Sequence, residues 1–108
     1  MGTFLGEFEH LLLLALVHLE DDAYGARIRR VIEQRTGRTV SPGAVYTALD
    51  RLERRRLVSS WLGEPTPQRG GKRKRYYRLE SAGARVLRQS QDALGRMMKG
   101  LRPKLEMP

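Results

Sequence analysis

Two helix boundaries lie close together near the middle of the sequence, and they constrain the fold more than any other feature. Gly37 follows an amphipathic stretch and is typical of the residue just beyond a helix, where the backbone becomes left-handed. Ser41 and Pro42 come four residues later. They predict a new helix, because the serine side chain can cap free amide groups and proline loses no hydrogen bond in the first turn. Two helices, at residues 23–36 and 42–55, are therefore expected on either side of a short turn.

Each of these helices has one apolar face. In residues 23–36 the side chains expected to face the core are Tyr24, Ile28, Val31 and Ile32. In residues 42–55 they are Val45, Ala48, Leu49 and Leu52. The opposite face of this second helix begins with small residues and is mostly polar. It carries Gly43, Thr47, Asp50 and Arg54, flanked by Tyr46 and Arg51.

The remaining sequence predicts two more helices and a hairpin. Residues 6–19 have apolar side chains at helical spacing on two faces. Residues 57–62 and 73–79 are expected to be strands, joined by the glycine- and proline-rich residues 63–71. A last helix is expected to start with Ser81 as its cap and to end at Pro103. The predicted fold class is mainly α with a small β-hairpin: a winged helix-turn-helix domain (1–80), a C-terminal dimerisation helix (81–103) and a disordered tail (104–108).

Size and composition exclude several classes of protein. A chain of 108 residues is long enough for one small domain, which gains stability from a partner subunit. It has no cysteine, which excludes disulfides and thiolate zinc sites and favours the cytoplasm. The longest apolar run, residues 11–17, is far below the ~20 residues that cross a bilayer. Glu7 and Glu9 stand where a secretory signal would have basic residues, so no membrane association is expected.

The positive charge is concentrated in the middle of the chain. Residues 27–78 hold 15 Lys and Arg but only 4 Asp and Glu, whereas the rest of the chain holds 6 and 8. The predicted hairpin alone contributes six cations: Arg69, Lys72, Arg73, Lys74, Arg75 and Arg78. Such a cluster is typical of a surface that binds the phosphates of a nucleic acid. A merely solvated surface is the alternative.

A helix-turn-helix followed by a basic hairpin predicts that residues 42–55 enter the major groove of DNA. Thr47 could contact a base edge, while Arg51 and Arg54 could reach guanine or phosphate. The hairpin would bind phosphates or the minor groove without regard to sequence. Asp50 opposes this interpretation unless its carboxylate pairs with Arg51, Arg54 or a cytosine amino group.

Several segments closely resemble the PadR-type transcriptional regulators over about residues 4–87. The similarity depends on the Ser-Pro-Gly-x-Val-Tyr sequence at residues 41–46 and on the Arg-Gly-Gly-basic-Tyr-Tyr pattern at residues 69–77. The resemblance implies a cytoplasmic bacterial repressor, a winged-helix homodimer that binds inverted-repeat operators, of the small subclass with one C-terminal helix. It places on the DNA side of the second helix Ser41, Pro42, Gly43, Tyr46, Thr47 and Arg51, to which the helical wheel adds Arg54. It places in the wing Arg73, Lys74 and Arg75.

Two positions depart from the family pattern. Arg56 stands where the family usually has glycine, so a left-handed backbone there would cost ~1 kcal/mol. Glu80 replaces the threonine that commonly follows the wing, which is expected to transfer the helix cap to Ser81. The geometry at both positions stays open.

The first and last helices have more apolar surface than one small core absorbs, and in the family they form the dimer interface. The interface is expected to include Leu13, Leu14, Val17, Leu87, Leu94, Met98 and Leu101. Intrachain packing is the alternative. Some family members bind flat hydrophobic effectors. Met97 and Met98 could line such a pocket, although core packing is favoured, and Trp61 is expected to pack on wing tyrosines or arginine stems instead of a ligand.

The sequence favours a regulator over other functions. Catalysis is not expected, because the chain has no cysteine, phosphate-binding glycine loop or metal-ligand spacing, and no cofactor is predicted. His10 and His18 are interpreted as ordinary helix residues. A non-specific architectural or RNA-binding protein is the main alternative, although an aromatic ladder for unpaired bases is missing. A third possibility is a module whose wing binds an acidic protein partner.

Overall fold

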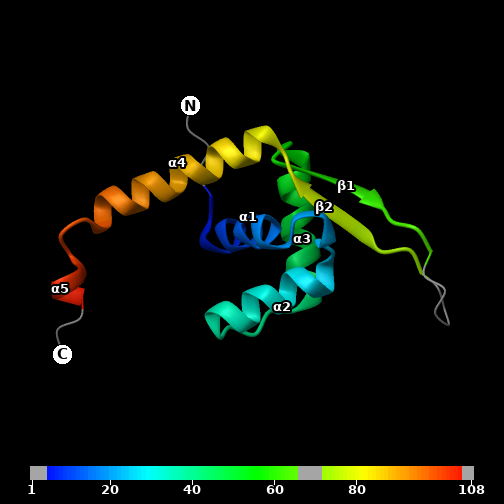
Figure 1. The fold of residues 1–108 in the computed structure, drawn as a ribbon, viewed down its shortest axis with the longest axis horizontal. Coiled ribbons are helices and arrows are strands. Elements are labelled where there is room, and N and C mark those ends of the chain that lie inside the picture. Colours follow the sequence, from blue (N-terminus) through cyan, green and yellow to red (C-terminus); the bar gives the residue numbers. More distant parts are fainter. Residues whose placement is uncertain (1–4, 66–71, 106–108) are drawn as a thin grey trace.

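The structure is a computed structural model that describes residues 5–65 and 72–105. Its elements follow the predicted order, with one additional helix at the end (Figure 1). They are α1 (Glu7–Leu19), a 3₁₀ turn (Glu20–Asp22), α2 (Gly25–Thr36), α3 (Pro42–Arg54), β1 (Val58–Leu62), β2 (Arg75–Leu79), α4 (Ser81–Met98) and the four-residue α5 (Arg102–Leu105). The fold class, mainly helical with a two-stranded antiparallel sheet, is confirmed.

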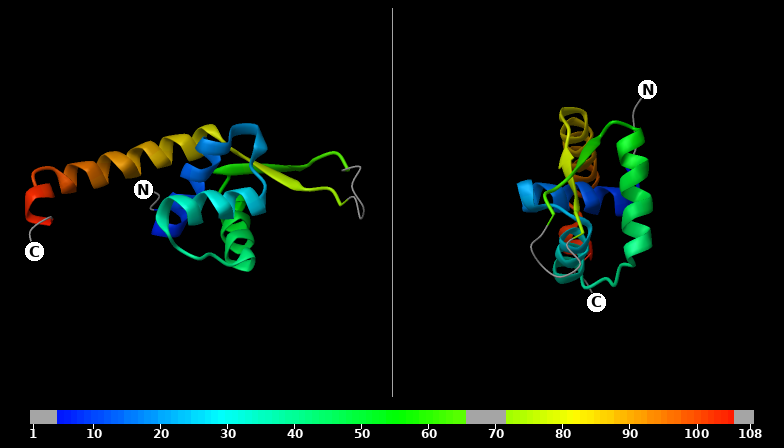
Figure 2. Two further views of the ribbon diagram at one scale, coloured as in Figure 1. Left: turned by 60° about the horizontal axis from the view of Figure 1, so that its bottom comes forward. Right: turned by 90° about the vertical axis from the view of Figure 1, so that its right-hand side faces the viewer.

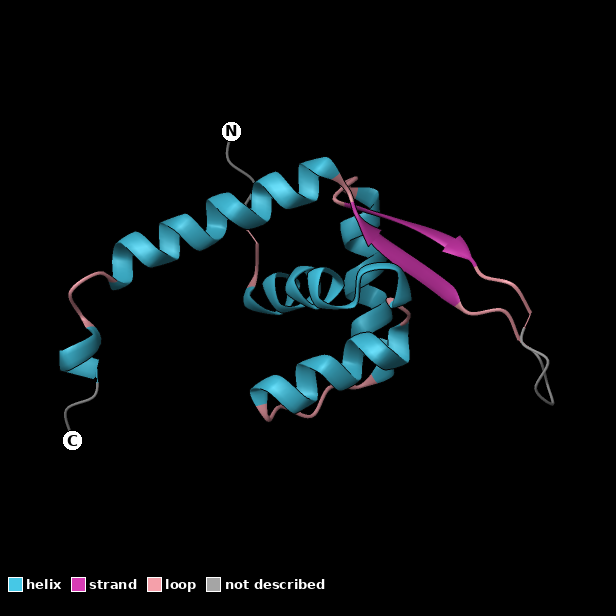
Figure 3. Ribbon diagram, in the orientation of Figure 1, coloured by secondary structure: helices cyan, strands magenta, loops and turns pink. Residues whose placement is uncertain are grey.

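Helices α1, α2 and α3 pack on one another around the core (Figure 3). The predicted core stripe of α3 is confirmed, since all four of its members are buried. Of the core residues predicted at positions 23–36, Ile28 and Ile32 are buried, while Val31 and Tyr24, which precedes α2, are half-buried. Side chains from outside the three helices complete the core, among them Tyr77 from β2 and Leu87 from α4.

Helix α2 begins two residues later than expected because Ala23 and Tyr24 pair with the hairpin. The Ala23 carbonyl accepts a hydrogen bond of 2.8 Å from the Tyr77 amide, and Tyr24 forms an antiparallel bridge with Tyr76. The residues that precede α2 therefore form a single β-bridge with β2. This pairing fixes the hairpin against the helical bundle.

The hairpin strands pair with Ser60 opposite Tyr77 and Trp61 opposite Tyr76. Alternation along β2 places Tyr77 in the core and Leu79 against it, whereas Tyr76 lies on the other face. Burial, and next the nearby Asp50 carboxylate, raise the pKa of Tyr77 to about 12.

The turn from α3 into β1 keeps a left-handed residue although it lacks glycine. Arg56 has a φ of 60°, the conformation in which a side chain costs ~1 kcal/mol. The Leu57 amide donates to the Leu52 carbonyl at 3.0 Å, and the Leu57 carbonyl accepts from the Glu80 amide at 2.9 Å. These bonds, together with the burial of Leu57, hold the backbone in this conformation.

The prediction that Ser81 caps the last helix is wrong. The N-cap is Glu80, and Ser81 is the first helical residue. The Glu80 carboxylate does not cap the helix either, because it accepts a hydrogen bond of 2.7 Å from the Ser59 hydroxyl on β1. The strand-to-helix connection is therefore fixed by contacts with β1.

The C-terminal boundaries also differ from the prediction. Helix α4 ends at Met98 instead of residue 103, and the backbone turns at Gly100, where φ is 79°. Pro103 does not end a helix but lies within α5. Lys104 also belongs to α5, so the prediction that a disordered tail starts at residue 104 is wrong. Residues 106–108 of that tail lie outside the described residues. A glycine just beyond a periodic stretch is a signal for the end of a helix, and here Gly100, not Pro103, indicates where α4 ends.

Candidate nucleic-acid interface

Helix α3 lies along one side of the molecule with one face in the core and the other in solvent (Figure 2). The Ser41 hydroxyl accepts a hydrogen bond of 3.1 Å from the Ala44 amide, so the predicted cap is confirmed. Every residue predicted for the DNA-facing side of α3 is exposed: Ser41, Pro42, Gly43, Tyr46, Thr47, Arg51 and Arg54. The helix therefore presents a continuous free face that starts with small residues.

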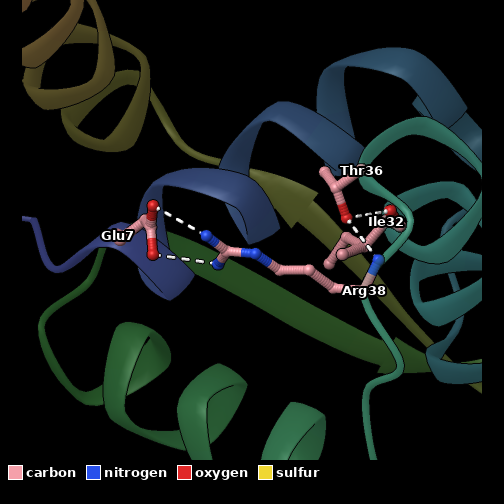
Figure 4. A network of polar contacts seen from close by, with 4 residues as sticks. All are labelled: Glu7, Ile32, Thr36 and Arg38. Atoms are coloured by element: carbon pink, nitrogen blue, oxygen red, sulfur yellow. Dashed lines mark hydrogen bonds and ion pairs between the residues drawn. The ribbon is translucent and has the colours of Figure 1, made fainter.

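The turn before α3 is tied to the start of α1 (Figure 4). Both terminal nitrogens of Arg38 donate to the Glu7 carboxylate at 2.9 Å, and these hydrogen bonds lower the pKa of Glu7. The Arg38 amide donates to the Thr36 hydroxyl at 3.2 Å, and that hydroxyl donates to the Ile32 carbonyl at 2.6 Å. Gly37 is left-handed, as predicted. Since Glu7 and Arg38 are 31 residues apart, no local sequence signal could have found this contact.

Tyr46 lies against the beginning of α2. A side chain at Gly25 would overlap the Tyr46 ring, so the glycine permits the two helices to approach closely. Gly25, Ala26, Arg29, Pro42 and Tyr46 line a small hollow between the starts of α2 and α3. Arg29 and Gly25 are therefore neighbours of the predicted DNA-facing side, and the sequence of α3 alone gives no signal of them.

The wing cations Arg73, Lys74 and Arg75 are all exposed. The Arg75 guanidinium donates to the Ser60 hydroxyl at 3.0 Å, and that hydroxyl donates to the Glu53 carboxylate at 2.7 Å. Glu53 belongs to α3, so this chain of hydrogen bonds links the wing to the helix. Arg69, the first cation counted in the hairpin, lies outside the described residues.

An aromatic stack stiffens the outer face of the hairpin. Trp61 and Tyr76 lie nearly parallel with ring centroids 5.7 Å apart, and the Arg78 guanidinium lies 5.0 Å from the Trp61 ring. Tyr76 also meets the edge of Tyr24, over whose ring the Lys74 amine lies at 4.2 Å. The expected packing of Trp61 on a wing tyrosine and an arginine is confirmed.

The predicted dimer residues differ in their exposure. Leu13 and Leu87 are at most 5% exposed and belong to the core of the single chain, so the prediction that they form the dimer interface is wrong. Leu14 is half-buried against the core. Val17, Leu94, Met98 and Leu101 are exposed and remain available to a partner. Met97 is 76% exposed, so the expectation that the two methionines pack in the core is also wrong.

Other kinds of site find no support in the described ranges. Within residues 5–65 and 72–105, no three His, Cys, Asp or Glu side chains are placed to hold a metal ion. His10 contacts Ser90 at 3.4 Å, which joins α1 to α4. Of the helices in the same ranges, none has the length and apolar character needed to cross a bilayer.

A capped helix with a free outer face, a preceding helix held close by a short turn, and a basic hairpin beside them define a winged helix-turn-helix DNA-binding protein. The model of the transcriptional regulator PadR-like family matches residues 13–89 of the sequence. The chain therefore belongs to the PadR-like family. It is a DNA-binding transcription regulator and not an enzyme.

Solved structures agree with this family. A PadR family regulator from Clostridium difficile is 26% identical, with a TM-score of 0.76 over 93% of this chain and 99% of that one. A PadR family regulator from Eggerthella lenta is 28% identical, with a TM-score of 0.69 over 94% and 88% of the two chains. A PadR-like regulator from Bacillus cereus is 20% identical and shares the fold, with a TM-score of 0.74 over 94% and 93%. No curated protein sequence matches the chain.

Proposed function

We propose that the protein is a homodimeric repressor that binds palindromic operators in the bacterial cytoplasm. The observation that carries the proposal is the complete division of α3 into a buried stripe and a free outer face. A helix that is fixed in this way can enter the major groove without disturbing the core. Binding to the operator would block transcription by occupying the promoter.

The reading helix and the wing have different chemistry and are proposed to have different roles. Thr47, Arg51 and Arg54 lie on the outer face of α3, where they can contact base edges. The exposed wing residues Arg73, Lys74 and Arg75 are all cations, which suits binding to phosphates in any sequence. Hydrogen bonds from Arg75 through Ser60 to Glu53 support a fixed angle between the two elements.

The exposed apolar residues of the C-terminal part support a dimer. Leu94, Met97, Met98, Leu101 and Leu105 are between 38% and 76% exposed. Apolar side chains that are so numerous and so close together on one segment are typical of a protein interface. A twofold dimer would place the two reading helices about 34 to 36 Å apart, one turn of DNA.

The test compares affinity for a palindrome from the protein's own promoter with affinity for scrambled duplex at one salt concentration. We expect a ratio of about 10³ or more, without added metal or cofactor. A ratio near one would favour a non-specific architectural protein, and no binding at about 50 mM salt would favour a protein-binding module. A reporter placed behind the same palindrome should be silenced by the protein, whereas activation would contradict repression.

Two variants test the division of roles. Thr47→Ala should lower specific affinity more than non-specific affinity, by about 1 kcal/mol or more. Neutralising Arg73, Lys74 and Arg75 together should weaken both specific and non-specific binding. It should also flatten the salt dependence, because up to about three fewer counterions are released on binding. Equal losses of specificity in both variants would contradict the proposed roles.

A further inference from the structure

The exposed face of α3 contains one carboxylate among hydroxyl and cationic side chains. Asp50 is three residues beyond Thr47 and four before Arg54, so the three lie in one row along the helix. All three are exposed. A DNA groove that contacts both Thr47 and Arg54 must therefore also lie against Asp50.

Asp50 is unusual because no described side chain binds its carboxylate directly, although its charge helps to raise the pKa of the buried Tyr77. Within residues 5–65 and 72–105 its carboxylate has no hydrogen bond or ion pair, and it does not pair with Arg51 or Arg54 on its own helix. The next carboxylate of α3, on Glu53, accepts a hydrogen bond of 2.7 Å from the Ser60 hydroxyl. The Glu53 carboxylate therefore helps to position the wing, whereas the Asp50 carboxylate holds no other described side chain in place.

A free carboxylate is favourable at few positions on duplex DNA. Near the sugar-phosphate backbone it is repelled, because the duplex carries about one negative charge per 1.7 Å. In the major groove it can accept a hydrogen bond from the N4 amino group of cytosine or the N6 amino group of adenine. Adenine N6 lies beside the acceptor N7, which repels a carboxylate, so cytosine is the favoured partner. An ionised carboxylate has no donor, so it cannot bond the acceptor atoms that guanine and thymine present there.

We propose that Asp50 is a specificity-determining residue that accepts a hydrogen bond from a cytosine amino group at one position of each operator half-site. Its charge also lowers affinity for DNA that lacks this cytosine. The inference depends on the proposed sequence-specific function of α3, and it goes further by naming one base in the recognised sequence.

The test is in vitro selection from random duplex DNA with the full chain and three variants. The wild type should enrich cytosine at one position of each half-site. Asp50→Asn should change that position to adenine, because an amide can pair with adenine N6 and N7. Asp50→Ala should lose the preference at that position alone. The matched control is Asp92→Asn, an exposed residue of α4 with the same change of charge, and it should select the wild-type sequence.

Affinity measurements at fixed salt give the expected magnitude. Replacing the selected cytosine should weaken wild-type binding by about 5- to 150-fold and Asp50→Ala binding by less than about 3-fold. Both Asp50 variants should bind scrambled duplex more tightly than the wild type and Asp92→Asn at the same salt. Thermal unfolding of the four proteins should coincide, because both positions are exposed.

Two failures are distinguishable. If the wild type enriches a defined site and Asp50→Asn enriches the same one, the role of Asp50 is wrong while the proposed function stands. The same holds if both Asp50 variants change affinity for all sequences equally. If the wild type enriches no sequence at low salt, the proposed function fails and the inference fails with it.

Discussion

The two halves of α4 have the same kind of sequence and opposite environments. In the first half, Leu87 is 5% exposed and Ser90 contacts His10 of α1. In the second half, every residue from 91 to 98 is exposed, including Leu94, although it follows Leu87 by one heptad. The views in Figures 1 and 2 show this half extending beyond the helical bundle, away from the hairpin.

The difference arises from the lengths of the two helices that pack together. Helix α1 has 13 residues and spans about 20 Å, whereas α4 has 18 residues and spans about 27 Å. The shorter helix can cover only part of the longer one, so apolar residues beyond it find no neighbour within the described chain. A heptad spacing thus defines a face but does not identify what covers it.

The largest expected effect contrasts the two halves directly. Leu87→Ala should lower the free energy of unfolding by about 2–5 kcal/mol, because the smaller side chain leaves a cavity in the core. The matched change Leu94→Ala should alter the free energy of unfolding by less than about 0.5 kcal/mol. This comparison is made at protein concentrations where the midpoint of urea denaturation does not depend on concentration. Urea denaturation measures both, and equal losses would show that the two halves are packed alike.

The second effect is a pH dependence that comes from the packed region. The pKa of Tyr77 is raised to about 12, so between pH 10 and pH 12 the unfolded chain releases this proton while the folded chain retains it. Stability is unaffected by this group below pH 10 and falls as pH rises through this window, by about 2–3 kcal/mol. Tyr77→Phe should remove that part of the slope in urea titrations. Identical slopes for the two proteins would contradict the burial of the hydroxyl.

A smaller effect concerns the start of α1, which supports the packed half of α4. The Glu9 carboxylate accepts hydrogen bonds from the Gly6 amide at 2.9 Å and from the Arg55 guanidinium at 3.1 Å. Glu9→Ala should cost about 1–2 kcal/mol, a modest amount because Arg55 is partly exposed to water. The exposed Glu7→Ala is the control and should cost less. The reverse order would mean that the surface pair with Arg38 is the stronger one.

The smallest effect on the fold is expected from the exposed half. Changing Leu94, Met98 and Leu101 together to glutamine should alter the stability of the single chain by less than about 0.5 kcal/mol. In sedimentation experiments the same change should leave only the monomer. The melting temperature of the variant should no longer rise with protein concentration. A wild type that sediments as a monomer at tens of micromolar would contradict the proposed homodimer.

Local signals predicted much of the fold and the candidate site. The Gly37 and Ser41-Pro42 signals located the turn, and helical periodicity separated the buried and free faces of α3. The signal at Gly100 is equally local, and the predicted helix end at Pro103 is wrong because the left-handed Gly100 follows the end of the helix first.

Contacts between distant segments were not predictable in the same way. The pairing of Glu7 with Arg38 joins residues 31 apart, and the pairing of Glu80 with Ser59 joins residues 21 apart. The sequence around Glu7 or Glu80 does not indicate the partner of its carboxylate, because a carboxylate can cap a helix, bind an arginine or remain in water. The wrong expectation for Ser81 has this origin.

The sequence by itself determined where α3 begins and which of its faces is free, since caps and periodicity depend on residues within a few positions of one another. Only the tertiary structure decided that Leu13 and Leu87 lie in the core while Leu94 and Met98 do not. All four are apolar residues at helical spacing, and their burial depends on how far a neighbouring helix extends. That length is set by residues elsewhere in the chain.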